Sequence, residues 1–248
     1  MHNAAAASEV PRPAATVMLV RDEAQGLAVY LTRRSSSSRF MPGAYVFPGG
    51  AVEAGDRDPA TLPLVHGTAG NAPAPVVVAA LRELLEEAGI LYIVRDDRAR
   101  TALDERIVHY LRGRLVAKIP FATLLAEHGF ILDATQLVHY SHWITPPTQR
   151  IRFDTHFFLA RAPADQRPSP DAVEVHDGTW LSPNDALRRA DRGELSIIFP
   201  TRKHLERLTH FDAVEPLLAH ARRRHIVPTR PFETPAGEIG LAEGSDAW

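Results

Sequence analysis

Short hydrophobic runs separated by polar turns open the chain, which is the pattern of paired β-strands. Residues 15–20 and 27–32 are rich in apolar and β-branched residues, and a polar connection closed by Gly26 separates them. A third run, residues 44–47, ends in a Pro-Gly-Gly turn at 48–50. The sequence therefore predicts a hairpin followed by a short strand and a sharp bend of the backbone.

The hydrophobic pattern takes the period of a helix after Pro75. Apolar side chains recur on one side of residues 76–88, Pro75 suits the first turn, and Gly89 is the expected end. The opposite side carries acidic residues, so we expect one apolar and one acidic face. The preceding segment, residues 57–75, is rich in Pro, Gly, Ala and Thr without a sustained period, which indicates an inserted loop.

The rest of the chain adds strands and helices. Strands are predicted at 90–94, 137–145, 151–160 and 179–181, and helices at 103–118, 121–128, 184–192, 202–210 and 214–224. We therefore expect one domain, with these parts: a flexible N-terminus at 1–13, a single domain at 14–226 with a helical insertion at 98–136, and an irregular C-terminal tail at 227–248.

Composition limits the function classes. The formal net charge is −2, which provides no overall positive field for nucleic acid or an anionic membrane. The chain has no cysteine, which excludes disulfides, thiolate zinc sites and a cysteine nucleophile. The longest apolar run, residues 76–81, is too short to cross a bilayer. We expect a cytoplasmic protein without nucleic-acid or membrane partners. A homodimer is possible, and the sequence does not decide the oligomeric state.

Three glutamates of the predicted helix indicate a divalent-metal site. Glu83, Glu86 and Glu87 are spaced so that a helix stacks their carboxylates within about one turn. The carboxylates repel one another unless a cation holds them, and hard oxygen ligands suit Mg²⁺ or Mn²⁺. Alone, a solvated helix face is the simpler interpretation. The glycine turn at 49–50 favours the metal site, because glycine lets the backbone approach a metal or a phosphate closely.

The turn and the acidic helix together resemble the signature of the Nudix family. Residues 82–90, Arg-Glu-Leu-Leu-Glu-Glu-Ala-Gly-Ile, fit its second half at every fixed position, and Gly50 fits its start. Asp56 stands where the family has Glu, and the interval from Asp56 to Arg82 is much longer than in the family. The resemblance implies a Nudix box with a loop inserted in its middle, within an α/β/α sandwich that places a mixed sheet between helices.

The resemblance also implies roles for individual residues. The metal ligands would be the side chains of one helix and one backbone carbonyl: Glu83, Glu86, Glu87 and Gly50. One of the glutamates would also handle the proton of the attacking water, and Arg82 would orient carboxylates together with Glu53. The general base of this family can come from a later loop, where Glu174 is the candidate, with an ordinary exposed glutamate as the alternative.

A second resemblance is to the coenzyme A diphosphatase branch of Nudix enzymes. It is carried by residues 31–35, Arg39, Gly43, 47–50, 143–146 and 152–155. The candidate substrate-binding residues are Arg33, Arg34, Ser35 and Arg39. Guanidinium groups match phosphate oxygens in geometry and charge, whereas without the motif a solvated basic loop is the simpler interpretation.

These resemblances imply hydrolysis of a diphosphate bond. The first substrate implied is coenzyme A or acyl-CoA, giving (acyl-)phosphopantetheine and adenosine 3',5'-bisphosphate. ADP-ribose or a dinucleotide such as NADH is an alternative substrate. A nucleotide sensor that binds without cleaving is the alternative of another class.

Histidines and aromatic residues of the later strands are expected in structural positions. His139 and His142 are three residues apart in a strand-like run, where regular alternation points them to opposite sides. Aromatic side chains of these strands offer faces for stacking on adenine, namely Trp143, Phe153, Phe157 and Phe158, but alternating aromatics in strands are more often core.

Overall fold

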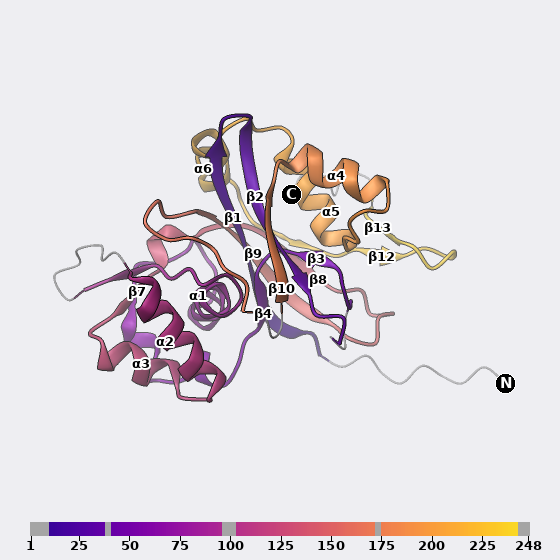
Figure 1. Ribbon diagram of the computed structural model, residues 1–248. Helices are drawn as coiled ribbons and strands as arrows, with labels where there is room; N and C mark the ends of the chain where they lie inside the picture. The colour runs from indigo at the N-terminus through magenta and orange to yellow at the C-terminus, as the bar shows by residue number, and fades with distance from the viewer. Residues whose placement is uncertain (1–9, 38–40, 96–102, 172–174, 243–248) are drawn as a thin grey trace.

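The computed structural model describes residues 10–37, 41–95, 103–171 and 175–242. Its centre is an eight-stranded sheet (Figure 1). The strands are β1 (Arg12–Glu23), β2 (Gly26–Arg34), β3 (Tyr45–Val46), β4 (Gly49–Ala51), β8 (Val138–Ile144), β9 (Phe153–Arg161), β10 (Val175–Leu181) and β11 (Pro228–Thr229). They follow the order β10-β2-β1-β9-β8-β11, with β3 beside β2 and β4 beside β1. The sheet is mixed, because β1 runs parallel to β9 and antiparallel to β2.

Helices cover both faces of this sheet (Figure 1). They are α1 (Ala74–Ala88), α2 (Glu105–Val116), α3 (Phe121–Glu127), α4 (Pro183–Asp191), α5 (Phe199–Leu208) and α6 (Val214–Arg222). Alternate residues of β1 enter two cores: Val17 and Leu19 pack with α1, α2 and α3, whereas Met18 and Val20 pack with α4, α5 and α6. The predicted α/β/α sandwich is confirmed.

The strongest sequence patterns correspond closely to observed elements. The predicted hairpin is present, with Val20 opposite Val29. The helix predicted at 76–88 is α1, and Gly89 ends it in the left-handed conformation with φ 66°. The helical insertion contains α2 and α3 as predicted. It also contains β7 (Ile131–Asp133) and the short 3₁₀ helix η3 (Ala134–Gln136).

Three weaker predictions need correction. The loop expected at 57–75 contains the end of a 3₁₀ helix, η1 (Gly55–Arg57), and all of a second, η2 (Leu62–Leu64). It also contains a strand, β5 (Val65–His66), in a small sheet of order β5-β7-β6 with β6 at Ile93–Val94.

The two ends of the chain are also more ordered than predicted. The tail expected to be irregular adds β11 to the main sheet beside β8 and forms a hairpin of β12 (Phe232–Glu233) and β13 (Ile239–Gly240). The flexible N-terminus expected through residue 13 is too long, since β1 begins at Arg12. In the described ranges, no helix has the length and apolar character needed to span a bilayer.

Candidate active site

The acidic side of α1 lies against the backbone bend at Gly49 and Gly50. The N–H of Gly49 donates to Oε2 of Glu87 at 2.9 Å. A side chain at Gly50 has no room, because a Cβ there would lie 2.3 Å from Oε1 of Glu83. The absence of a side chain therefore lets β4 and the helix approach closely. The two halves of the site meet in space although a long segment separates them in sequence.

Arg82 is buried in the middle of this acidic cluster. Its Nε and Nη2 donate to the two carboxylate oxygens of Asp56, both at 2.9 Å. Its Nη1 donates to Glu83 at 2.9 Å and to Glu86 at 2.5 Å. Burial opposes the charge of Arg82, but the hydrogen bond to Asp56 and the charges of Glu83, Asp56 and Glu86 raise its pKa overall. Arg82 therefore stays cationic and holds three carboxylates in place.

Asp56 connects the bend to the helix. Its side chain is 1% exposed, and it accepts a hydrogen bond from the backbone N–H of Glu53 at 2.8 Å in addition to its contacts with Arg82. Arg82 also donates to the carbonyl of Ala51 at 3.0 Å. Among the residues that follow the bend, Asp56 therefore pairs with Arg82. The prediction that the Glu53 side chain does so was wrong. The shorter carboxylate at position 56 reaches Arg82 because η1 carries it beneath the helix.

Only part of the acidic cluster faces a cavity. Glu83 and Glu87, with Gly50, line a cavity of about 460 Å³. Glu86 has a side-chain exposure of 29% and pairs with Arg82. Mg²⁺ typically binds through one or two carboxylates, keeping waters and taking up substrate phosphates, so this donor set fits a divalent ion. In the described residues, the carboxylate oxygens of Glu83, Glu86 and Glu87 do not all lie within 4.8 Å of one another, as three ligands of one ion would.

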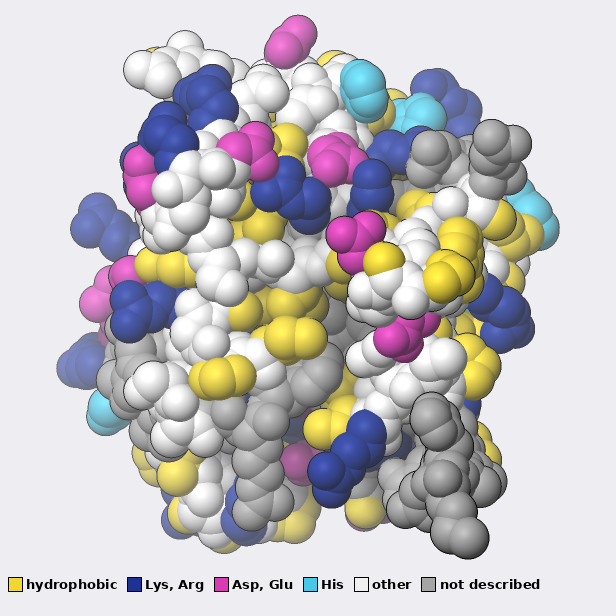
Figure 2. All heavy atoms as spheres, turned by 90° about the vertical axis from the view of Figure 1, so that its right-hand side faces the viewer, with side chains coloured by type: hydrophobic (Ala, Val, Ile, Leu, Met, Phe, Trp, Pro, Cys, Tyr) yellow, Lys and Arg dark blue, Asp and Glu magenta, His cyan; other side chains and the backbone are white. Residues whose placement is uncertain are grey.

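The cavity also has an apolar wall and two cationic side chains. The wall includes Trp143, Ile144, Phe153, Phe157, Ile198 and Phe199. Arg12 and Arg34 are the arginines of the described lining. Hydrophobic side chains lie across the middle of the face toward which the β12–β13 hairpin projects (Figure 2). The cavity thus combines carboxylates of α1, beside β4, with an apolar surface that comes mainly from β8, β9 and α5.

Comparison with known proteins gives the family. A family model described as the NUDT19 Nudix domain matches residues 66–208, more than half of the chain. The chain belongs to the Nudix family. A crystal structure of a Nudix hydrolase from Alicyclobacillus acidocaldarius is similar to it with a TM-score of 0.72 at 28% identity, covering 85% of this chain and 96% of that one. The Nudix fold implied by the sequence is therefore confirmed.

Two curated relatives share most of this Nudix domain. Acyl-coenzyme A diphosphatase NUDT19 of Gallus gallus is 29% identical over 235 residues, which cover 75% of this chain and 62% of that protein. The Homo sapiens protein of the same name is 28% identical over 252 residues, covering 78% of this chain and 64% of that protein. The chain therefore spans less than two thirds of the length of these relatives.

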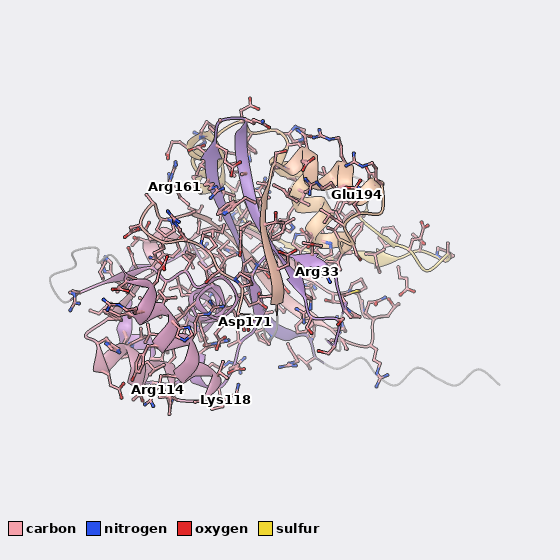
Figure 3. All side chains as sticks on the ribbon, in the orientation of Figure 1. Arg33, Arg114, Lys118, Arg161, Asp171 and Glu194 are labelled. Atoms are coloured by element: carbon pink, nitrogen blue, oxygen red, sulfur yellow. The ribbon has the colours of Figure 1, made fainter. Side chains whose placement is uncertain are left out.

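The residues of the narrower motif separate in the Nudix structure. Arg34 lines the cavity, whereas Arg33, the preceding residue of β2, lies between Asp177 of β10 and Tyr45 of β3 (Figure 3). Consecutive strand residues point to opposite faces, so the two arginines cannot share one role. Ser35 is buried, and its hydroxyl lies 2.7 Å from that of Ser37. Arg39 and Glu174 lie outside the described residues.

Several cavity residues were not predicted as site residues. Arg12 falls in the N-terminal segment predicted to be flexible, although β1 begins at it and it lines the cavity. Trp143 and Phe157 are buried as expected of core aromatics, yet they also line the cavity, as does Phe153. Phe199 comes from α5, far away in sequence, and no local spacing connects it to the Nudix box. The motif stretches at 143–146 and 152–155 do contain residues of this wall, and they are the sequence feature from which it could have been predicted.

Proposed function

We propose that the protein is a metal-dependent Nudix hydrolase that cleaves the diphosphate of coenzyme A or an acyl-CoA. The products would be (acyl-)phosphopantetheine and adenosine 3',5'-bisphosphate. The observation that carries this proposal is the contact of Glu83 and Glu87 with the Gly49–Gly50 bend at a cavity of about 460 Å³. Its size is in the range of small-molecule sites. The two relatives named acyl-coenzyme A diphosphatase support the substrate class.

The acidic end of the cavity would hold the reacting diphosphate. Glu83, Glu87 and the Gly50 carbonyl are the proposed ligands of Mg²⁺ or Mn²⁺. A divalent ion supplies positive charge to the phosphoryl oxygens and lowers the pKa of a bound water. Arg82 holds the carboxylates of Glu83 and Glu86 in place. Glu86, which is partly exposed and pairs with Arg82, is the first candidate for taking up the proton of the attacking water, and Glu174 remains the second.

The other parts of the cavity would recognise the rest of the substrate. Arg34 and Arg12 provide guanidinium groups for phosphate oxygens remote from the scissile bond. The wall formed by Trp143, Phe153 and Phe199 would contact the uncharged pantetheine and acyl portions, since apolar surface gains free energy when it leaves water. Binding of these remote groups would orient the diphosphate toward the carboxylates.

A product screen tests the proposed activity. Purified protein is incubated with Mg²⁺ or Mn²⁺ and with CoA, acyl-CoA, ADP-ribose and NADH in parallel, and products are identified by mass spectrometry. We expect metal-dependent release of adenosine 3',5'-bisphosphate from CoA or acyl-CoA. Dephospho-CoA is the matched control, because it lacks only the 3'-phosphate. A preference for ADP-ribose or NADH, or binding without metal-dependent products, would contradict the proposal.

A further inference from the structure

A β-bulge in β8 gathers histidines that regular strand alternation would separate. The register of β8 against β9 shifts between His139 and Ser141. His139 therefore lies opposite Phe158, and His142 lies opposite His156. Phe158 and His156 are two residues apart in β9 and share a face, so both histidines of β8 lie on that face. The expectation that His139 and His142 point to opposite sides is wrong because of this bulge.

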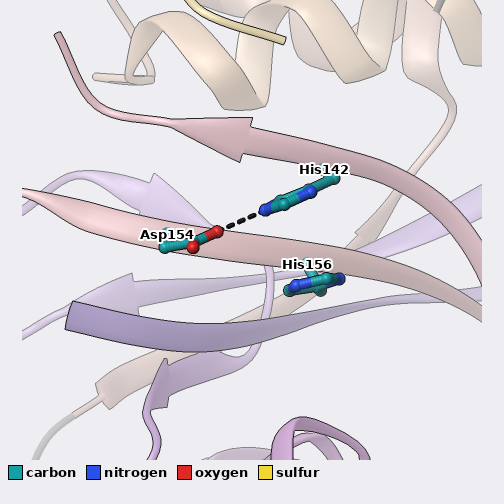
Figure 4. Close-up of side chains that lie close together, drawn as sticks. All are labelled: His142, Asp154 and His156. Atoms are coloured by element: carbon teal, nitrogen blue, oxygen red, sulfur yellow. Dashed lines mark hydrogen bonds and ion pairs between the residues drawn. The ribbon is translucent and has the colours of Figure 1, made fainter. Parts of the chain in front are cut away.

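The three imidazole rings form a row that ends in a carboxylate. The ring centroid of His156 lies 5.0 Å from that of His139 and 4.0 Å from that of His142. Nε2 of His142 contacts Oδ1 of Asp154 (Figure 4). His142, Asp154 and His156 each offer a ligand atom, and these atoms lie within 4.8 Å of one another. The group is half-buried, so an ion can reach it from solvent.

His139 provides a second observation at the same place. His139 is buried, and its Nε2 lies 3.1 Å from Nδ1 of His156. A buried ring that contacts one nitrogen of a metal-binding histidine typically sets the orientation of that ligand. Because His139 occupies Nδ1 of His156, Nε2 of His156 is the ring nitrogen that can bind an ion.

The histidine row is separate from the cavity. Phe153, Thr155 and Phe157 line the cavity, so Asp154 and His156, which alternate with them in β9, belong to the opposite face. His156 is paired with Ala15 of β1, and Ala15 is paired on its other side with Gly50. The histidine row therefore lies two strands away from the catalytic bend. Its residues are distinct from the proposed ligands of the hydrolytic ion.

We propose that His142, His156 and Asp154 form a second metal site, selective for a transition-metal ion such as Zn²⁺. Two imidazoles and one carboxylate suit Zn²⁺, whereas Mg²⁺ prefers oxygen ligands. The rings of His142 and His156 are nearly parallel, at 15°. Imidazole lone pairs lie in the ring plane, so one ring turns about its side-chain bonds when the ion binds. His142 is the ring that turns, since His139 holds His156.

Metal titration of the whole protein tests this site. The protein is purified without a polyhistidine tag, stripped with a chelator and titrated with Zn²⁺ in excess Mg²⁺ by calorimetry. Co²⁺ is titrated in parallel and followed by its visible absorption. We expect one bound Zn²⁺ that Mg²⁺ does not displace, and a loss of affinity of about 100-fold or more in His142→Ala and in His156→Ala.

Two control variants separate this site from other sources of binding. Glu87→Gln weakens the proposed hydrolytic ion site and is expected to retain the Zn²⁺ affinity. His109→Ala removes an exposed histidine of α2 and is expected to bind as the wild type does. Loss of Zn²⁺ binding in Glu87→Gln, with full retention in His156→Ala, would place the ion on α1 and overturn the proposal. So would a wild-type protein that takes up no Zn²⁺ in excess Mg²⁺.

Thermal unfolding shows whether the variants remain folded. Zn²⁺ is expected to raise the Tm of the wild type and of His109→Ala, because an ion that binds only the folded state stabilises it. It is expected to leave the Tm of His156→Ala unchanged. If an alanine variant does not fold, Asp154→Asn decides, since it keeps the shape of the carboxylate and removes its charge. An unchanged Zn²⁺ affinity in Asp154→Asn counts against the site. None of these measurements depends on hydrolytic activity.

Discussion

The two ends of the cavity are built in different ways. At the charged end, Glu83 and Glu87 line the cavity. Behind them, Arg82 connects Glu83 to Asp56 and Glu86 at 2.5–2.9 Å, and these groups come from α1 and the segment after the bend. At the apolar end, the surface is assembled from β8, β9 and α5, which are far apart in the sequence. The proposed catalytic groups are thus encoded locally, whereas the proposed recognition surface exists only through tertiary packing.

This difference predicts different responses to substitution. Removing one member of the charged end leaves another buried charge without its partner, which is strongly unfavourable. Trimming a side chain of the apolar end removes only apolar contact with the ligand. Substitutions at the charged end should therefore change kcat or the stability of the fold, and those at the apolar end should change KM.

The largest effect is expected from Glu86→Gln and Glu87→Gln. Each replaces a carboxylate with an amide of nearly the same shape, and the amide oxygen at position 87 can still accept from the Gly49 N–H. We expect kcat to fall by about 10³-fold or more in each, since a positioned proton-transfer group contributes 10²–10⁴-fold and a metal several kcal/mol. Steady-state kinetics measures kcat, and circular dichroism shows whether each variant keeps the wild-type fold. Near-normal turnover in both variants would count heavily against the assignment.

Arg82→Met is expected to destabilise the fold. It leaves the buried carboxylate of Asp56 without its cation, which typically costs about 3–5 kcal/mol. Urea unfolding measures the change. The double variant Arg82→Met, Asp56→Leu should regain part of this loss, because the buried charge of Asp56 is removed together with its partner. A double variant that is no more stable than the single one would show that the pair is not the source of the stability.

Arg34→Ala and Arg33→Ala form a matched pair. Arg34 lines the cavity, whereas Arg33 is exposed outside it. Losing a hydrogen bond to a charged group costs about 1.5–3 kcal/mol, so we expect KM for CoA to rise about 10-fold or more in Arg34→Ala. Arg33→Ala should keep KM within about twofold, given the small effect of exposed charges. Equal KM values in the two variants would remove Arg34 from the substrate site.

Phe199→Ala is expected to give the smallest effect. Its ring is part of the apolar wall and half-buried, so its loss should cost about 1 kcal/mol of ligand contact, less than full burial of a Phe provides. We expect KM for long-chain acyl-CoA to rise a few-fold while kcat stays unchanged. Comparing acyl chains of increasing length locates the contact. A fall in kcat as large as that in Glu86→Gln would show that the two ends are not independent.

Local patterns in the sequence predicted the charged end and left the rest open. The i, i+3, i+4 spacing of Glu83, Glu86 and Glu87 needs only a helix to bring the side chains together, and the structure provides one. The partner of Arg82 could not be chosen from spacing, because both Glu53 and Asp56 precede the inserted segment. Only the position of η1 selects Asp56.

Features that depend on irregular backbone were not predictable. The bulge that turns His139 and His142 to one face involves no glycine or proline at that position, so nothing in the local residues indicates it. Strand β11 has two residues and pairs with β8 far away in sequence, which gives no detectable period. The apolar wall has the same origin, since its residues are ordinary strand and helix aromatics until packing brings them to one cavity.

Mn²⁺ binding to α1 is the most direct test of the central claim. Free Mn²⁺ is followed by electron paramagnetic resonance during titration of the wild type, Glu87→Gln and His156→Ala. We expect the wild type and His156→Ala to bind the ion equally, and Glu87→Gln to bind it about tenfold or more weakly. Equal Mn²⁺ binding by Glu87→Gln and the wild type would contradict the assignment of the ion to α1 and the Gly49–Gly50 bend.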